Sequence, residues 1–148
     1  MLQDERTLVV VADGGQARFF EERRLGGPLR ERVDWSEGLK PHHAGSGSPG
    51  RVFDRFGSGS HPVGGVAPHD QAEARFMSAV AGRIAELATK DAFDGVVLIA
   101  PPRALGQLRE ALSPAVAARV RHSEPKDRVH ADLQGIETAV GMIRRHDA

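Results

Sequence analysis

The chain contains no cysteine and no tyrosine. The missing thiols exclude disulfide bonds, thiolate metal sites and a cysteine nucleophile. Long apolar runs are also missing, and the segment Met1–Arg6 carries three charged residues, unlike a signal peptide or a membrane-spanning helix. We therefore expect a cytoplasmic protein that makes no contact with a membrane.

An excess of charge of either sign is absent as well. The 148 residues include 20 basic and 20 acidic side chains, so the formal net charge is zero. The positive field of a typical nucleic-acid-binding protein is therefore missing, and any contact with RNA must be local. Of the basic residues 17 are arginine, which suits bidentate phosphate recognition but also follows from arginine-rich codon usage.

The first third of the chain predicts a β-meander. Leu8–Ala12 is a continuous apolar run, typical of a strand buried on both faces, and Asp13-Gly14-Gly15 predicts a tight turn after it. The return strand is expected over Gln16–Glu22, and a third strand over Leu29–Trp35 after a turn at Gly26-Gly27-Pro28. With 40% hydrophobic content in 148 residues, we predict one domain over residues 1–148.

The second half alternates helices and strands. Apolar residues at helical spacing predict a helix from Asp70, its expected N-cap, to Lys90. A strand is expected over Val96–Ala100, followed by a short helix through Leu105, Leu108 and Leu112 with Pro102 in its first turn. A helical piece after Ser113-Pro114 and a strand Val120–Ser123 come next. The last helix is expected to have Asp127 as its cap, and its apolar face comprises Val129, Leu133, Ile136, Val140 and Ile143. This order predicts an α/β fold with a mixed sheet and helices packed on it.

The long segment 36–69 lies between these halves. Half of it is Gly, Pro or Ser, and it is predicted to be one long flexible loop that carries function. It holds four of the seven histidines, at 42, 43, 61 and 69, and neutral imidazole is a good metal ligand. Their spacings match no ligand pattern, and no metal and no cofactor are predicted.

Four motifs follow one another along the chain: Val11-Ala12-Asp13-Gly14 with Ala17-Arg18-Phe19-Phe20, Pro49-Gly50-Arg51-Val52-Phe53-Asp54, Ala100-Pro101-Pro102-Arg103 with Leu105-Gly106, and Lys126-Asp127. In this order and at these separations they resemble the bacterial host attachment protein family, whose members are required for attachment to host cells. This family is distantly similar to the middle domain of archaeo-eukaryotic class 1 peptide-chain release factors. The resemblance implies a ribonuclease-H-like fold and suggests ribosome association.

Release factors promote peptidyl-tRNA hydrolysis with a Gly-Gly-Gln triplet, and two places in this chain resemble it. Gly14-Gly15-Gln16 has the letters, but it lies in the predicted first hairpin, where a tight turn explains it. The comparable position before the long helix has Gly64 and Gly65 as the loop turn, followed by Val66. Valine can neither hydrogen-bond a transition state nor position water, so we do not expect peptidyl-tRNA hydrolysis.

The sequence carries no signature of other enzyme chemistry. A nuclease of this fold would gather acids such as Asp13, Asp70, Glu73 and Asp94 around metal ions. Each has a local explanation as a turn, a cap or a favourable charge in a first helical turn. No serine lies in a nucleophile-elbow sequence. We therefore expect a protein that is not an enzyme.

Binding remains. Arg51 and Arg55 flank Phe53 and Phe56, a pattern that can stack on bases and pair with phosphates, although Phe53 would equally serve to anchor the loop. Arg103 follows a predicted central strand, where open α/β sheets place ligand contacts, although it could be an ordinary helix-start residue. The predicted binding residues for RNA or a partner are Arg51, Phe53, Arg55, Arg103 and Lys126.

Three functions follow from these patterns. The leading hypothesis is a non-enzymatic, intracellular domain that binds RNA or the ribosome. The alternatives are a protein-interaction module related to attachment or adhesion, with a protein partner, and a hydrolase acting on RNA or on an ester-linked nucleic acid. A homodimer through an apolar edge left by the meander stays open.

Overall fold

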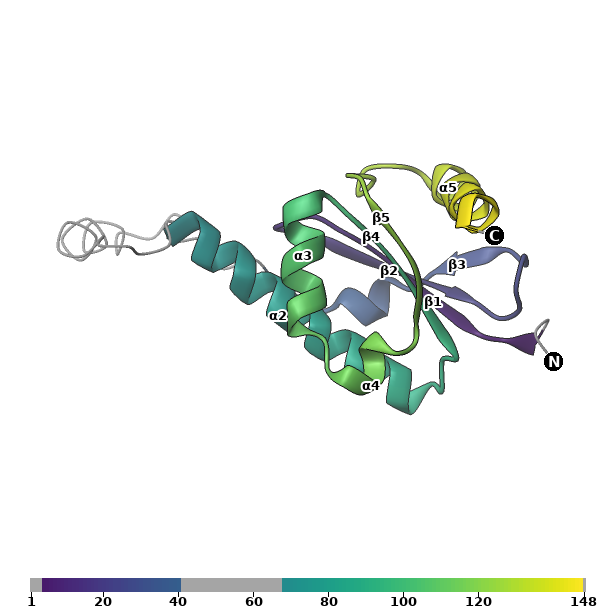
Figure 1. The fold of residues 1–148 in the computed structure, drawn as a ribbon, viewed down its shortest axis with the longest axis horizontal. Coiled ribbons are helices and arrows are strands. Elements are labelled where there is room, and N and C mark those ends of the chain that lie inside the picture. Colours follow the sequence, from purple (N-terminus) through teal and green to yellow (C-terminus); the bar gives the residue numbers. More distant parts are fainter. Residues whose placement is uncertain (1–3, 41–67, 148) are drawn as a thin grey trace, which may run out of the picture.

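The computed structural model describes residues 4–40 and 68–147, which form a mixed five-stranded sheet with helices on both faces (Figure 1). The strand order is β3-β2-β1-β4-β5. The strands are β1 Thr7–Ala12, β2 Ala17–Glu22, β3 Leu29–Glu31, β4 Gly95–Ala100 and β5 Val120–Pro125. Only β2 runs antiparallel to the others, so the meander is followed by parallel strands, as the predicted ribonuclease-H-like mixed sheet requires.

The two central strands explain why the sheet is buried on both sides. All six residues of β1 and all six of β4 are buried, and the strands pair in parallel with Val9 opposite Val97. Alternate side chains therefore supply two separate cores, one on each face of the sheet. The sequence predicted this from two uninterrupted apolar runs, and that prediction is confirmed.

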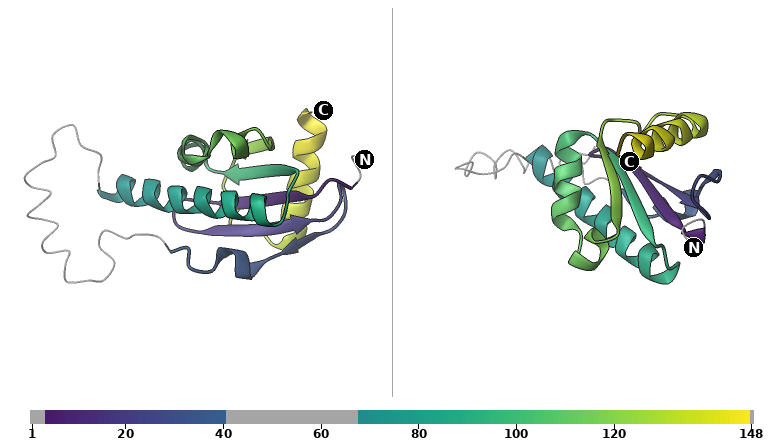
Figure 2. Two further views of the ribbon diagram at one scale, coloured as in Figure 1. Left: turned by 90° about the horizontal axis from the view of Figure 1, so that it is seen from below. Right: turned by 45° about the vertical axis from the view of Figure 1, so that its right-hand side comes forward.

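Helices cover both faces of the sheet, and each face has its own core (Figure 2). The helices α2 Pro68–Lys90, α3 Pro102–Ala111 and α4 Pro114–Ala117 supply Phe76, Leu105 and Val116 to a core with Leu8 and Phe19. The helix α5 Leu133–Asp147 covers the other face. Among the described residues, no helix has both the length and the apolar character needed to span a membrane.

The third strand is shorter than predicted. It ends at Glu31, and the chain then forms a 3₁₀ helix, η2, over Val33–Ser36. The reason is Trp35, which was expected in the strand but is buried beneath the sheet in an edge-to-face contact with Phe93, with ring centroids 5.6 Å apart. Burial of this large ring favours the turn over continued pairing.

The edge left by the meander also differs from the expectation. It is β3, whose three residues are buried Leu29, exposed Arg30 and half-buried Glu31. A short strand with two charged residues is a common way to prevent edge-to-edge pairing, so this edge is less apolar than the sequence indicated, and the homodimer stays an open alternative.

The predicted boundaries of the long segment and of two helices are corrected by the structure. Ser36 belongs to η2, and residues 68–69 open α2, so Asp70 lies in the first turn of that helix and is not its N-cap. Residues 41–67 lie outside the described residues.

The last helix begins later than predicted, because a long-range hydrogen bond holds Val129 ahead of it and a local one caps it at Asp132. Val129 is buried ahead of the helix, and its carbonyl oxygen accepts a hydrogen bond from the Arg18 guanidinium at 3.0 Å. The cap is Asp132, whose carboxylate accepts from the Gly135 N–H at 2.8 Å. Asp127, the predicted cap, instead accepts from the Val129 N–H.

Candidate functional site

The carboxyl ends of the neighbouring parallel strands β1 and β4 lie at the same edge of the sheet, and the chain leaves the two ends in different ways. β1 continues into the antiparallel strand β2, whereas β4 continues into α3. In open α/β sheets, ligands bind outside the carboxyl ends of strands at such a point. The residues gathered here are Asp13, Gly14, Asp70, Glu73 and Arg103, and we call them the carboxyl edge.

Asp13 fixes the turn that closes the first hairpin. Its Oδ1 accepts hydrogen bonds from the N–H groups of Gly15 and Gln16, both at 2.8 Å, and its own N–H donates to the Gln16 carbonyl at 2.9 Å. This confirms the turn prediction for Gly14-Gly15-Gln16. The Asp13 carboxylate is engaged in organising backbone, as expected for an Asx-type turn.

The side chain of Glu73 on helix α2 lies against the turn at Gly14. A Cβ atom built at Gly14 would lie 2.7 Å from Oε2 and 2.8 Å from Cδ of Glu73. Glycine at position 14 therefore leaves room for the Glu73 carboxylate, which lies against the backbone of the turn. Sequence reasoning missed this contact, because nothing in the pattern links two residues so far apart in the chain.

Arg103 is the exposed cation of the carboxyl edge. It is the second residue of α3, and its Nη2 lies 2.6 Å from Oδ1 of Asp70, while its Nε lies 4.0 Å from Oε1 of Glu73. The hydrogen bond to Asp70 raises the pKa of Arg103 above its usual value. Its side chain is nevertheless 61% exposed, so the guanidinium is oriented by one carboxylate and still accessible to a partner.

Lys126 lies at the same end of the sheet. Pro125, the last residue of β5, is paired with Ala100, the last residue of β4, and Lys126 follows it as an exposed residue. Its N–H donates to the Glu124 carbonyl at 2.9 Å. Lys126 and Arg103 therefore follow neighbouring strand ends.

The remaining predicted site residues lie outside the described residues: Arg51, Phe53, Arg55, Gly64 and Gly65. The segment that holds them rejoins the described structure at Pro68, two positions before Asp70 in the chain. Its return point is therefore next to the carboxyl edge.

The acids weighed for metal chemistry do not meet as one set. Asp94 precedes β4 at the opposite end of the sheet, where its Oδ2 accepts from the Arg6 N–H at 2.9 Å. Within residues 4–40 and 68–147, no group of three or more His, Asp or Glu side chains could hold a metal ion. The described part of the carboxyl edge can offer hydrogen bonds and charges of both signs.

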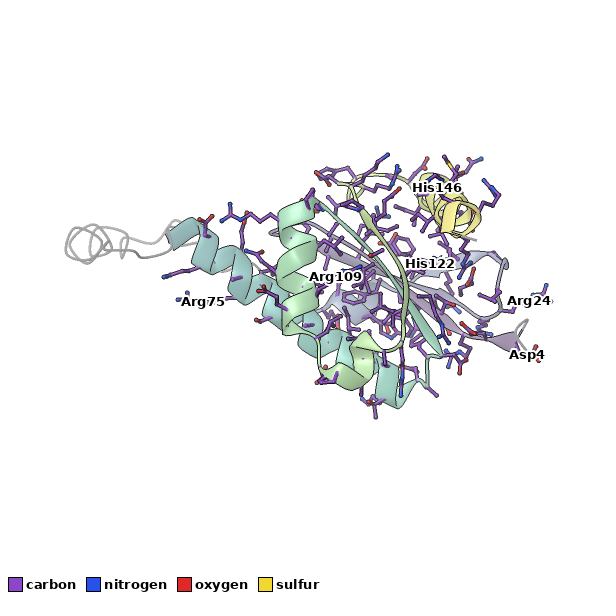
Figure 3. The ribbon with its side chains drawn as sticks, viewed as in Figure 1. Asp4, Arg24, Arg75, Arg109, His122 and His146 are labelled. Carbon is purple, nitrogen blue, oxygen red and sulfur yellow. The ribbon has the colours of Figure 1, made fainter. Side chains whose placement is uncertain are left out.

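Aromatic side chains are not available for stacking in the described part of the chain. Phe19, Phe20, Phe76, Phe93 and Trp35 are all buried in the two cores. Exposed arginines away from the carboxyl edge, such as Arg75 on α2 and Arg109 on α3, are scattered in Figure 3. The described surface therefore lacks the aromatic platform that single-stranded nucleic acid usually needs.

One protein family matches this chain. Its model, described as "Protein required for attachment to host cells", matches residues 8–140. The chain belongs to this family. No curated protein matches it. The match confirms the predicted membership of the attachment family, whereas the more distant similarity to release factors stays a prediction.

Proposed function

We propose that this attachment-family protein is a non-enzymatic binding module, and that its carboxyl edge contacts a protein partner. The observation that carries the proposal is Arg103, which is oriented by Asp70 at 2.6 Å while 61% of its side chain stays exposed. A cation held in this way loses little conformational freedom on binding, so it suits recognition of a partner's carboxylate or carbonyl groups.

The charges around Arg103 favour a protein over a nucleic acid. Asp70 and Glu73 surround the single guanidinium with two carboxylates. Phosphate groups would be repelled by these carboxylates, whereas a protein surface with charges of both signs can complement them. The partner is therefore expected to present an acidic residue to Arg103 and a basic residue to Asp70 or Glu73.

A binding role also agrees with the contacts that two acidic residues of the carboxyl edge make. The carboxylate of Asp13 accepts two backbone N–H groups, and that of Asp70 is paired with Arg103. Neither is placed as an uncommitted general base. We propose that the protein works in the cytoplasm and that its contribution to attachment is regulatory.

Attachment of cells to their host tests the proposal. Bacteria that lack the protein would be supplied with the wild type, Arg103→Glu or Arg75→Glu. Arg75 is an exposed arginine on α2 that points away from α3 in Figure 3, so it is a matched control. We expect Arg103→Glu alone to reduce attachment, with both variants folded as judged by circular dichroism. Normal attachment with Arg103→Glu would overturn the proposal.

RNA or ribosome binding is the second candidate, and one observation favours it. The segment with Arg51, Phe53 and Arg55 rejoins the fold two residues before Asp70, so it can bring two cations and an aromatic ring to the carboxyl edge. We propose that Arg51, Phe53 and Arg55 make the contacts with RNA.

Co-sedimentation with ribosomes across a salt series separates the two candidates. Pelleting that falls as salt rises, and is lost in the Arg51→Ala/Arg55→Ala variant, would support RNA binding, because phosphate contacts release counterions. Absence of pelleting at low salt would remove the ribosome from consideration and leave the protein partner. The Arg75→Ala variant serves as the control for loss of positive charge.

A further inference from the structure

A second site is independent of the carboxyl edge. A cleft of about 280 Å³ lies between α5 and the turn that joins β2 to β3. Its walls come from the turn residues Gly26, Gly27 and Pro28, from Leu29 of β3, and from α5. Figure 1 shows α5 lying beside this turn, on the face of the sheet opposite to α2.

Two of the residues that line the cleft form an ion pair whose charges compensate one another. Glu22 is almost fully buried, with 2% of its side chain exposed, and Arg144 binds both of its carboxylate oxygens, at 2.7 and 2.8 Å. The N–H of Gly26 also donates to Oε2 of Glu22, at 3.2 Å. Neither member of this pair therefore demands a charged ligand.

Glu137 on α5 is different because its charge is not compensated. It is half-buried in the wall of the cleft, and its Oε2 accepts the Leu29 N–H at 2.9 Å. Among the described residues, it has no salt bridge and no second hydrogen bond. A half-buried carboxylate with one neutral donor is stabilised by a cation that can donate hydrogen bonds.

The rest of the wall sets the shape of that cation. Pro28, Leu29 and Val140 are apolar and lie around the cleft together with Glu137. A volume of about 280 Å³ is below the range of drug-sized pockets, which begins at about 300 Å³. The ligand must therefore be small, with a charged head and a short apolar body.

We propose that this cleft binds an alkylammonium group. The ammonium donates to the free oxygen of Glu137, and the alkyl chain lies on Pro28, Leu29 and Val140. Such a group has two natural sources, a free aliphatic amine and the lysine side chain of a protein.

Titration with n-butylammonium chloride, followed by two-dimensional NMR, tests the proposal. We expect saturable shifts of the backbone amide signals of Gly26 and Gly141, which line the cleft. 1-Butanol, which has the same chain without the charge, should give no saturable shift. Absence of saturation with n-butylammonium, or equal binding of 1-butanol, would overturn the proposal.

Two variants make the test specific. Glu137→Gln keeps an oxygen for the Leu29 N–H but removes the charge, and should weaken binding about tenfold or more. Glu110→Gln, an exposed residue of α3, should bind like the wild type. Unchanged affinity in Glu137→Gln contradicts the proposal.

A third variant keeps the test valid if Glu137→Gln does not fold. A Cβ atom at Gly141 would meet only Nη1 of Arg145, at 3.4 Å, so a side chain is tolerated there. Gly141→Leu should fill the cleft and abolish binding, and retained binding would argue against this site. A parallel titration with Nα-acetyl-lysine amide identifies the source: binding would extend the proposal to protein lysines, and its absence alongside n-butylammonium binding would restrict it to free amines.

Discussion

Arg144 in the last turns of α5 makes two hydrogen bonds to the carboxylate of Glu22 on β2, at 2.8 Å to Oε2 and 2.7 Å to Oε1. The two residues are 122 positions apart in the chain. Glu22 has 2% of its side chain exposed, so it has given up most of its contact with water to make this pair. The pair also ties the end of the chain to the sheet.

The first prediction concerns the loss of this partner. Arg144→Ala should lower the free energy of unfolding by about 3 kcal/mol, because a buried carboxylate is left without its cation. Arg145→Ala, at the exposed neighbouring position, should change it by less than about 0.5 kcal/mol. Urea denaturation at pH 7 measures both. Similar values for the two variants would show that the Glu22 pair contributes little.

A second prediction follows from Glu31 and Arg18. Arg18 binds Glu31 through Nε at 2.9 Å and Nη2 at 2.7 Å, and these hydrogen bonds lower the pKa of Glu31 below its usual value of 4.5. A lowered pKa in the folded state contributes stability above the unfolded pKa, and this stability is lost as the pH falls through the folded pKa.

The corresponding experiment compares Glu31→Gln with the wild type at pH 7 and at a series of lower pH values. The variant should be less stable than the wild type at pH 7, and the difference should shrink as the pH falls through the folded pKa of Glu31, because the carboxylate that binds Arg18 is then protonated. Urea denaturation at each pH gives the difference. Glu110→Gln should show no such trend, and a pH-independent deficit in Glu31→Gln would exclude the ion pair as its cause.

The third prediction separates two kinds of glycine. Gly106 lies within α3 with nothing within 4 Å of a Cβ position, so Gly106→Ala should stabilise the fold by about 0.5–1 kcal/mol. Gly14→Ala should not share this gain, because its new methyl group would lie 2.7 Å from the Glu73 carboxylate.

Glu73 can move, because the clash involves the end of its side chain. We therefore expect Gly14→Ala to cost about 1 kcal/mol and to displace Glu73 from the turn. Thermal unfolding ranks the two variants, and the amide signals of α2 report the displacement. An increase in stability for Gly14→Ala would mean that the close approach to Glu73 is absent in solution.

The fourth prediction identifies the cap of α5. Asp132→Ala should lower the free energy of unfolding by about 1 kcal/mol, because Asp132 accepts the Gly135 N–H at 2.8 Å in the first turn. Asp127→Ala should cost less, since Asp127 lies before the helix and makes one bond at 3.3 Å. Equilibrium denaturation of both variants is sufficient, and a larger loss in Asp127→Ala would contradict the assignment.

Much of the fold could be predicted from local patterns. The apolar runs of β1 and β4 and the Asp13 turn have the positions that the sequence indicates. Errors occur where a distant contact decides the local structure. Trp35 leaves the predicted strand to pack on Phe93, and Val129 stays outside the predicted helix while its carbonyl binds Arg18.

The candidate sites were also predictable from the sequence only in part. Arg103 was predicted from its place after an apolar strand, and the structure adds the Asp70 carboxylate that orients it. The contact of Gly14 with Glu73 has no signal in the sequence, and neither has the cleft beside α5. Both depend on how helices that are remote in the chain lie against the meander.

The sequence by itself determined the family, the central strands and most helices, because each depends on residue types at short spacing. Only the tertiary structure decided the strand order, the helix caps and the pairs Glu22–Arg144 and Asp70–Arg103. The physical reason is that hydrophobic periodicity specifies which face is buried but not which surface covers it. Which charged residues form ion pairs depends on which of these surfaces pack together.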